Sequence, residues 1–214
     1  MTANHYQIRV CDNPTCGLRY PLVAGHPFGE RCPLCLASTH IALEHALERE
    51  TVSPPGPVSA PVLEALLDNI RSAWNVGAIF RSADGLGVSK LYLGGITPTP
   101  ETAGVAKTAL GAELCLPWVA ARNALTLAEE LISSGVRLWA LEQDARAVPV
   151  ETEWQPDQRR VVLIVGNEVS GVDPALLDLC ERIVFIPMQG RKRSLNVEVA
   201  FGVGVSALKN ACRR

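Results

Sequence analysis

Four cysteines near the N-terminus have the spacing of a metal-binding site. Four residues separate Cys11 from Cys16, two separate Cys32 from Cys35, and fifteen lie between the two pairs. Two close pairs of thiolates suit one tetrahedral Zn²⁺ ion, as in zinc ribbons. A segment this short buries too little apolar surface to fold alone, so bound metal would supply most of its stability. The spacing therefore predicts a zinc-ribbon-like module, and a set of free thiols is the alternative.

The histidines add a possibility at this site and exclude one elsewhere. They all lie within the first 45 residues, at His5, His26, His40 and His45. His26 or His40 could replace one sulfur ligand, although four paired cysteines make that replacement unnecessary. Because no histidine follows, the rest of the chain cannot use a histidine as an acid, base or metal ligand.

Three later segments each combine an apolar run with glycine and polar side chains. They are residues 69–87 (NIRSAWNVGAIFRSADGLG), 162–171 (VLIVGNEVSG) and 186–200 (IPMQGRKRSLNVEVA). Each joins a strand-like run to a turn rich in Gly, Asn or Ser, and two of them then open a helix. Turns at the carboxyl ends of parallel strands are the usual position for a ligand.

The first segment carries a guanidinium whose chemistry is limited. We expect Asn75 to cap a helix and Arg81 to lie within its second turn. The pKa of an arginine lies above about 12, so Arg81 is a poor general base. It could instead bind a phosphate through two hydrogen bonds, or stabilise an oxyanion that develops during a reaction.

The second segment places Gly166, Asn167 and Glu168 directly after a buried strand. A glycine at this point lets a ligand approach the backbone closely. Glu168 is the only strong acid of the segment and a candidate for chemistry. The plain alternative is a carboxylate that favours the start of the helix expected at residues 173–180.

The third segment ends a strand at Met188 and continues into a basic loop. We expect Asn196 to cap the last helix and to aim its side chain into the site. The run Arg191-Lys192-Arg193 is either a solvated charge cluster or a contact for the phosphates of a nucleic acid.

The elements that position these residues alternate between strands and helices. Strand-like runs occur at residues 62–70, 90–95, 136–142, 161–166 and 182–188. Helices are expected at residues 76–87, 103–111, 124–135, 173–180 and 196–212. Near-continuous Val, Ile and Leu strands between amphipathic helices indicate an α/β fold, with a mostly parallel sheet and helices on both faces.

The chain divides into three parts on composition. Residues 1–50 form the zinc-ribbon-like module, which ends in a short helix over residues 41–50 with Ser38 or Thr39 as its cap. Residues 51–61 are a proline-rich linker that cannot continue a helix. Residues 62–214 form the α/β domain.

Charge and hydropathy bound the class of protein. The net charge of −2 and the pI near 6.1 do not indicate a nucleic-acid binder, so any such contact must come from local basic patches. The N-terminus lacks the apolar region of a signal peptide, and no window approaches the roughly 18 apolar residues of a membrane span. We therefore expect a cytoplasmic protein, in which seven cysteines argue against a disulfide framework.

Together and in this order, the three segments resemble the signature motifs of the SPOUT superfamily. More narrowly they are similar to its SpoU/TrmH branch, the RNA ribose 2′-O-methyltransferases that use S-adenosylmethionine. The resemblance covers roughly residues 61–211. It implies a deep C-terminal trefoil knot, which is an exception to normal chain topology. It also implies a homodimer with each active site near the dimer interface, and tRNA or rRNA as the substrate.

The resemblance also implies roles for individual residues. The family's active-site positions fall on Asn75, Arg81, Glu168, Ser194 and Asn196. Main-chain and side-chain groups around the adenosyl part of the cofactor would come from Leu141, Gly166, Ile186, Met188, Ser194 and Leu195. We expect RNA contacts from Arg71, Arg191, Lys192 and Arg193. Glu198 departs from the family pattern, which commonly has a small or hydroxyl residue at that position.

Some alternatives stay open at this stage. The proton of the ribose hydroxyl could pass to Glu168, to the cofactor, to water or to an RNA phosphate. A knotted RNA-binding protein without transferase activity is the first rival function. A dinucleotide-binding oxidoreductase is the second, although the chain lacks a Gly-x-Gly-x2-Gly turn after its first predicted parallel strand.

Overall fold

A computed structural model describes residues 5–23, 26, 30–46, 62–151 and 160–211. The chain falls into two compact units, residues 1–54 and 55–214, and each is described here by itself. The predicted proline-rich linker, residues 51–61, lies outside the described residues. Among the described helices, none has both the length and the apolar character needed to cross a bilayer.

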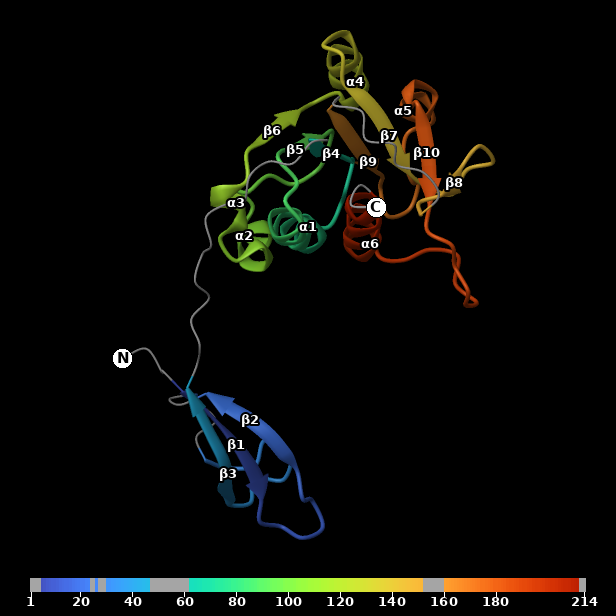
Figure 1. Ribbon diagram of the computed structural model, residues 1–214. Coiled ribbons are helices and arrows are strands. Elements are labelled where there is room, and N and C mark those ends of the chain that lie inside the picture. The colour runs from blue at the N-terminus through green and yellow to red at the C-terminus, as the bar shows by residue number, and fades with distance from the viewer. Residues whose placement is uncertain (1–4, 24–25, 27–29, 47–61, 152–159, 212–214) are drawn as a thin grey trace. The chain divides into compact units, whose positions relative to one another are not determined.

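The N-terminal unit is a three-stranded antiparallel sheet with the strand order β2-β1-β3 (Figure 1). Its strands are β1 (His5–Cys11), β2 (Arg19–Val23) and β3 (Thr39–Ala46). The helix predicted over residues 41–50 is wrong for the described part of that range, because residues 41–46 belong to β3. Pairing along the whole of β1, from Cys11 with Thr39 to His5 with Ala46, overrides the helical propensity of Ala, Leu and Glu.

The C-terminal unit alternates strands and helices. Its strands are β4 (Leu63–Asp68), β5 (Leu91–Gly94), β6 (Trp118–Ala121), β7 (Arg137–Leu141), β8 (Val148–Pro149), β9 (Val161–Val165) and β10 (Arg182–Phe185). Its helices are α1 (Ala73–Gly85), α2 (Ala103–Ala109), α3 (Ala112–Cys115), α4 (Ala124–Ser133), α5 (Pro174–Leu179) and α6 (Val197–Ala211). Three short elements, β6, β8 and α3, were not predicted from the sequence, and each is two to four residues long.

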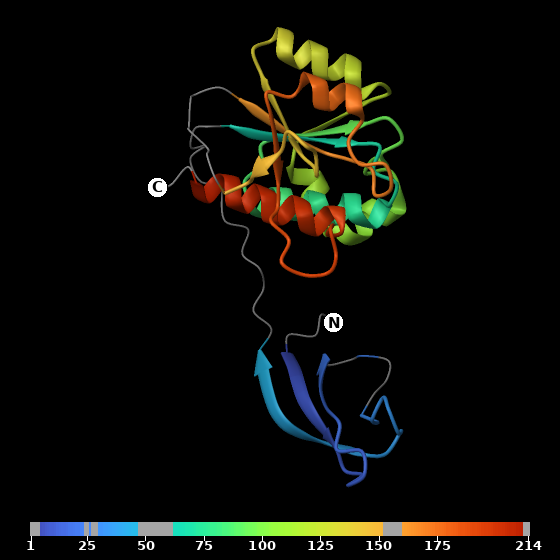
Figure 2. The same cartoon turned by 90° about the vertical axis from the view of Figure 1, so that its right-hand side faces the viewer.

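These strands form one seven-stranded sheet in the order β6-β5-β4-β9-β7-β10-β8, and every neighbouring pair is parallel. Helices α1, α2, α3 and α6 cover one face of the sheet, and α4 and α5 cover the other (Figures 1 and 2). The predicted α/β class, with a parallel sheet between helical layers, is confirmed. The trefoil knot stays a prediction of the family resemblance.

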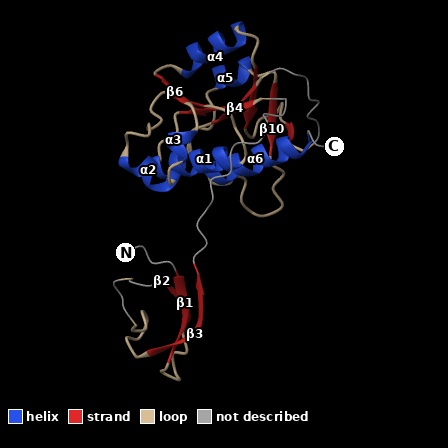
Figure 3. Ribbon diagram, turned by 60° about the vertical axis from the view of Figure 1, so that its left-hand side comes forward, coloured by secondary structure: helices blue, strands red, loops and turns tan. Residues whose placement is uncertain are grey.

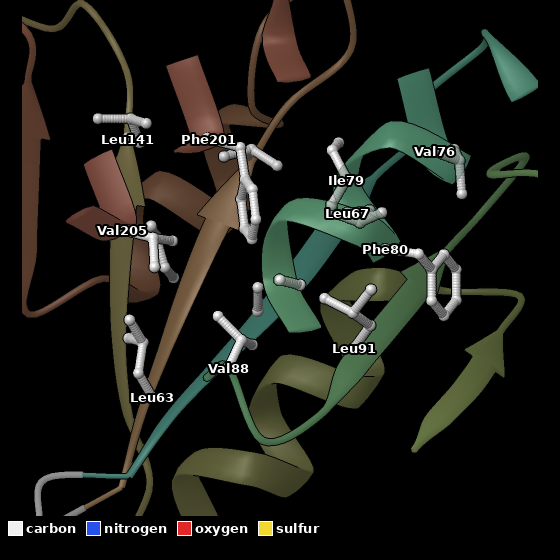
Figure 4. Close-up of a cluster of buried hydrophobic side chains, with 14 of the residues drawn as sticks. Leu63, Leu67, Val76, Ile79, Phe80, Val88, Leu91, Leu141, Phe201 and Val205 are labelled. Atoms are coloured by element: carbon white, nitrogen blue, oxygen red, sulfur yellow. The ribbon is translucent and has the colours of Figure 1, made fainter. Parts of the chain in front are cut away.

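Alternate residues of the strands pack into two separate hydrophobic cores, one on each face of the sheet. Leu63, Ala65 and Leu67 of β4 pack toward α1 and α6, whereas Leu66 packs toward α4 and α5. Figure 4 shows the first core, where Ile79 and Phe80 of α1 and the Phe201 side chain of α6 lie over the sheet. Because both faces are covered, β4, β5 and β9 are buried throughout, as their apolar sequences predict.

The first and last helices of this domain begin at polar caps. Ser72, not Asn75, is the N-cap of α1, and its hydroxyl accepts the N–H of Asn75 at 3.3 Å. The prediction that Asn75 caps this helix was therefore wrong. The side-chain amide of Asn75 makes other contacts instead. Asn196 does occupy the start of α6, where its Oδ1 accepts the N–H of Glu198 at 2.9 Å. Figure 3 shows α1 and α6 beside each other on the same side of the sheet.

Candidate active site

A cavity of about 360 Å³ opens at the carboxyl ends of β7, β9 and β10. Its volume lies within the range of small-molecule sites, roughly 300 to 1,000 Å³. The edge of a parallel sheet where strand ends meet is the usual ligand position in α/β proteins. The cavity is lined by Leu141, Glu142, Gln143, Val165, Gly166, Asn167, Glu168, Val169, Gly171, Phe185, Ile186, Met188, Arg193, Ser194, Leu195, Asn196, Val197 and Ala200.

The predicted cofactor-binding residues gather in this cavity although they come from distant parts of the sequence. All six of them line it: Leu141, Gly166, Ile186, Met188, Ser194 and Leu195. Glu168, Asn196 and Arg193, which were predicted for catalysis or RNA contact, line it as well. Asn75 and Arg81 are not among the lining residues. The structure thus brings the second and third segments to one cavity and places the first segment beside it.

Gly166 is required by the protein's own backbone. A Cβ at this position would lie 2.1 Å from the nitrogen of Val172 and 2.2 Å from the carbonyl carbon of Gly171. The turn that follows is closed by two backbone hydrogen bonds between Asn167 and Gly171, at 3.1 and 2.9 Å. The close approach expected at Gly166 is therefore already made by the chain itself, and this tight turn forms one wall of the cavity.

Glu168 binds the start of α1. One carboxylate oxygen accepts the backbone N–H of Arg71 at 2.9 Å, and the other accepts the N–H of Ser72 at 3.1 Å and the side-chain amide of Asn75 at 2.9 Å. Partial burial opposes ionisation, but these hydrogen bonds prevail and hold the pKa of Glu168 below its usual range. Glu168 does favour a helix start, at α1 rather than at α5. Ionised and occupied by three donors, it is a poor proton acceptor.

Asn75 joins this carboxylate to the last helix. Its side-chain oxygen accepts the amide of Asn196 at 3.2 Å while its nitrogen donates to Glu168. One network of side-chain hydrogen bonds at the cavity's rim therefore joins three segments that are far apart in sequence. They are the starts of α1 and α6 and the turn after β9. Such a network fixes the orientation of each side chain in it.

The predicted cationic residues lie outside this chain of hydrogen bonds. Arg81 is exposed in the third turn of α1, and the side chains of Arg71, Arg191 and Lys192 are exposed as well. Only Arg193 of this set lines the cavity. Within one chain, the structure does not bring the guanidinium of Arg81 into the cavity.

Three polar residues that line the cavity, Glu142, Gln143 and Asn167, were given no role from the sequence. Glu142 lines the cavity, and its carboxylate accepts the N–H groups of Val172 at 3.0 Å and Gln143 at 2.8 Å. Asn167 Oδ1 accepts the N–H groups of Val169 and Ser170 and so shapes the turn after β9. The available signal was position, because Glu142 ends one predicted strand and Asn167 directly follows another.

Glu198, which departs from the family pattern, contacts α1 and does not line the cavity. Its carboxylate accepts the hydroxyl of Ser82 at 2.9 Å and so links α6 to α1. It is not among the residues that line the cavity. The departure is therefore a local contact between helices.

The four N-terminal cysteines converge as their spacing predicts. Their sulfur atoms all lie within 4.8 Å of one another, with Cys11 and Cys35 at 3.4 Å and Cys16 and Cys32 at 3.8 Å. Tetrahedral Zn–S bonds of about 2.3 Å place sulfurs about 3.8 Å apart, so the cluster fits a zinc ion. His40 contacts Asp12 at 2.6 Å instead. Within the described residues, the group that could hold a metal consists of cysteines alone.

Comparison with known proteins agrees with this geometry. The profile of the SpoU rRNA Methylase family matches residues 63–206. The 23S rRNA (guanosine(2553)-2′-O)-methyltransferase RlmP of Bacillus subtilis is 32% identical over 146 residues, which cover 67% of this chain and 56% of that protein. The 23S rRNA (guanosine-2′-O-)-methyltransferase RlmB of Xanthomonas axonopodis pv. citri is 33% identical over 141 residues, covering 66% and 55%. The chain thus spans little more than half the length of these relatives.

A solved structure adds a ligand to the comparison. The AdoMet-bound rRNA methyltransferase from Sinorhizobium meliloti superposes with a TM-score of 0.64 at 28% identity, over 71% of this chain and 57% of that one. The range that the family profile matches, residues 63–206, contains the strands of the seven-stranded sheet, the residues that line the cavity and the hydrogen-bonded side chains at its rim. On the family profile and these relatives, the chain belongs to the SpoU rRNA methylase family.

Proposed function

We propose that this protein is an S-adenosylmethionine-dependent RNA methyltransferase that modifies a ribose 2′-hydroxyl of tRNA or rRNA. The observation that carries the proposal is the cavity at the ends of β7, β9 and β10, whose walls contain every residue predicted to bind the cofactor. The names of relatives that methylate guanosine 2′-oxygens in 23S rRNA support the same chemistry.

The residues present fit the methyl donor. Apolar side chains of Leu141, Ile186 and Leu195 suit an adenosyl group, and Gly166 lines the same cavity. S-adenosylmethionine would supply an electrophilic methyl group on a sulfonium. The protein's task is to hold that carbon in line with the ribose oxygen, and positioning of this kind contributes roughly 7 to 11 kcal/mol in well-oriented reactions.

The roles at the rim follow from the hydrogen bonds. Glu168 acts as an anchor for Asn75 and the start of α1, because its acceptor positions are occupied and its pKa is lowered by the hydrogen bonds it accepts against the opposing effect of burial. Arg81 binds the phosphate beside the target ribose or stabilises the developing alkoxide. The proton then passes to water, to the donor or to an RNA phosphate.

A homodimer would complete this arrangement. Arg81 points outward from α1, and α6 beside it exposes Val199 and Val203 at 44% and 42% of their surface. Exposed apolar side chains on a helix favour burial against another surface. We propose that a second copy covers this side of α6 and places Arg81 near an active site. Sedimentation of the wild-type chain measures this directly, and a monomer at micromolar concentration would contradict it.

The N-terminal unit would be a zinc-bound arm that helps to recruit RNA in the cytoplasm. The convergence of four sulfur atoms within 4.8 Å supports the metal. We expect metal analysis to find about one zinc per chain, and Cys32→Ser to lose it while donor affinity is unchanged. Cys115→Ser, an exposed cysteine outside the cluster, is the matched control. A metal-free protein with an ordered N-terminal unit would refute the zinc site.

Two titrations and one assay test the proposed function. We expect S-adenosylmethionine and S-adenosylhomocysteine to bind calorimetrically and NAD not to bind. Bulk RNA from cells that lack the protein should accept a methyl group, and mapping of 2′-O-methyl sites should locate it. Binding of NAD alone would favour an oxidoreductase. Donor binding without methylation of tRNA or rRNA would favour an RNA-binding protein that has no transferase activity.

A further inference from the structure

Trp74 is an indole at the surface beside the candidate active site. Among the aromatic side chains that the structure describes, Trp74 is the exposed one, with 56% of its surface accessible. Tryptophan is highly buried on average, so an exposed ring in the first turn of α1 requires an explanation.

Helix α2 holds the indole in place. The hydroxyl of Thr108 donates to the carbonyl of Trp74 at 3.1 Å. A Cβ on Gly104 would lie 2.9 Å from the Cβ of Ala73 and 3.9 Å from the indole nitrogen, so α2 packs closely against α1 at the base of the ring. The ammonium of Lys107 lies 5.1 Å from the ring centroid, within the range of a cation–π contact. The ring is therefore ordered by its neighbours while more than half of it faces solvent.

The position of the ring connects it to the reaction. Asn75, the next residue, donates to Glu168 at 2.9 Å and accepts from Asn196 at 3.2 Å, and both partners line the cavity. On α1, Trp74 and Arg81 are seven residues apart and so lie on the same face. An aromatic ring, an ammonium and a guanidinium are thus placed along one side of the helix that borders the site.

We propose that Trp74 and Lys107 form a stacking platform for a base of the RNA strand that carries the target ribose. Every base has a π-face, so an exposed indole accepts one without reading its sequence, and unstacked bases are what proteins recognise in single-stranded RNA. The ammonium beside the ring matches the charge of the adjoining phosphate. This inference rests on the proposed function only for the identity of the strand. Its central claim, that RNA contacts the ring, is tested by binding alone.

The test uses the full chain with four substitutions. Trp74→Ala removes the ring, Trp74→Phe keeps a smaller one, and Lys107→Gln removes the charge. Leu114→Ala is the matched control, because Leu114 is an apolar side chain of α3 that is 85% exposed. Thermal unfolding and calorimetric binding of S-adenosylhomocysteine verify that each variant is folded with an intact donor site.

Affinity for bulk tRNA and bulk rRNA, and KM for RNA where methylation is measurable, give the outcome. We expect Trp74→Ala to weaken RNA binding about 5- to 150-fold, the range for loss of one base–aromatic stack, with donor affinity unchanged. Trp74→Phe should recover most of the loss, and Lys107→Gln should reduce the salt slope by about 1. Quenching of tryptophan fluorescence by RNA should disappear in Trp74→Phe.

Two results would overturn the platform. In the first, Trp74→Ala binds RNA as Leu114→Ala does. In the second, Trp74→Ala changes the sedimentation of the protein without changing RNA affinity, which would assign the ring to an interface between two copies of the chain. Failure of the wild-type chain to bind the methyl donor would contradict the proposed function instead, and leaves the RNA-binding comparison of these variants decisive for the platform.

Discussion

The two sides of the candidate active site are built differently. On the side proposed to bind the methyl donor, the walls of the cavity come from strand ends and from turns closed by backbone hydrogen bonds, such as those between Asn167 and Gly171. On the side proposed to face RNA, four basic residues are exposed, and they lie just before α1, within α1 and in the loop before α6: Arg71, Arg81, Arg191 and Lys192. A single chain therefore forms the walls of the proposed donor site, whereas our proposal requires RNA or a second copy to position the exposed cationic side chains.

A network of side-chain hydrogen bonds connects these two sides of the site. Glu168 and Asn196 belong to the cavity, and Asn75 belongs to the helix that carries Arg81. The hydrogen bonds of these three side chains connect the wall of the cavity to the start of α1, and we propose that this connection helps to direct the exposed Arg81. Substitutions on one side of the site therefore test whether the other side is affected.

The largest effect is expected from Arg81→Ala. Loss of one group that stabilises a developing oxyanion costs on the order of 100- to 1,000-fold in turnover. Donor affinity should change by no more than a few-fold, since Arg81 lies outside the cavity. Single-turnover methylation and calorimetry separate the two quantities. Arg122→Ala, another exposed arginine, should leave both unchanged. Near-normal turnover in Arg81→Ala would refute its role.

The reverse separation is expected from Gly166→Ala. A Cβ at Gly166 would collide with backbone atoms 2.1 and 2.2 Å away, so the turn that walls the cavity must shift. We expect donor affinity to fall about tenfold or more and the melting temperature to fall with it. Gly85→Ala, at a position where a Cβ meets nothing within 4 Å, is the control. An unchanged donor affinity would show that this wall is not part of the donor site.

Glu168→Gln tests the link between the two sides through its pH dependence. Burial raises the folded-state pKa of Glu168, but hydrogen bonds from the start of α1 outweigh it and hold that pKa below its usual range. Its contribution to stability is therefore present above about pH 4.5 and is lost as pH falls through the folded-state pKa. We expect the variant to lose about 1 kcal/mol at pH 7, as for other helix caps, and to match the wild type in acid. Thermal unfolding at several pH values measures both, with Glu129→Gln as the control.

A pH-independent difference between Glu168→Gln and the wild type would contradict this account of the carboxylate. A large loss of methylation with no loss of stability would also contradict it, since it would return Glu168 to a direct chemical role.

The smallest effect is expected from Arg191→Gln combined with Lys192→Gln. Both side chains are exposed and lie outside the residues that line the cavity. Removing them should weaken RNA binding a few-fold and lower the salt slope by about 2, with donor affinity unchanged. An unaltered salt slope would make this run an ordinary solvated cluster.

The family resemblance, together with the strand and turn patterns, predicts many of the residues that line the candidate cavity. Apolar strands bounded by Gly and Asn turns place Gly166 and Ile186 at the edge of a parallel sheet, and all six predicted cofactor residues line one cavity. The convergence of the four cysteines follows from their spacing in the same way. Asn196 was predicted as a helix cap because it directly precedes a helical pattern. Its side chain does cap α6 by accepting the N–H of Glu198.

The failures occur where a distant contact decides. Residues 41–46 have the composition of a helix but pair with β1. Asn75 resembles a cap, yet Ser72 takes that position, and Asn75 instead bonds with Glu168 and Asn196 from later segments. Exposure also cannot be read from a pattern, so neither the outward position of Arg81 nor the open ring of Trp74 was foreseen.

The most direct test of the donor site is a crystal structure of the full chain with S-adenosylhomocysteine. The account predicts the ligand in the cavity at the ends of β7, β9 and β10, with its adenosyl group against the backbone of Gly166, Ile186 and Leu195. A ligand bound elsewhere, or an empty cavity in crystals saturated with it, would contradict the account.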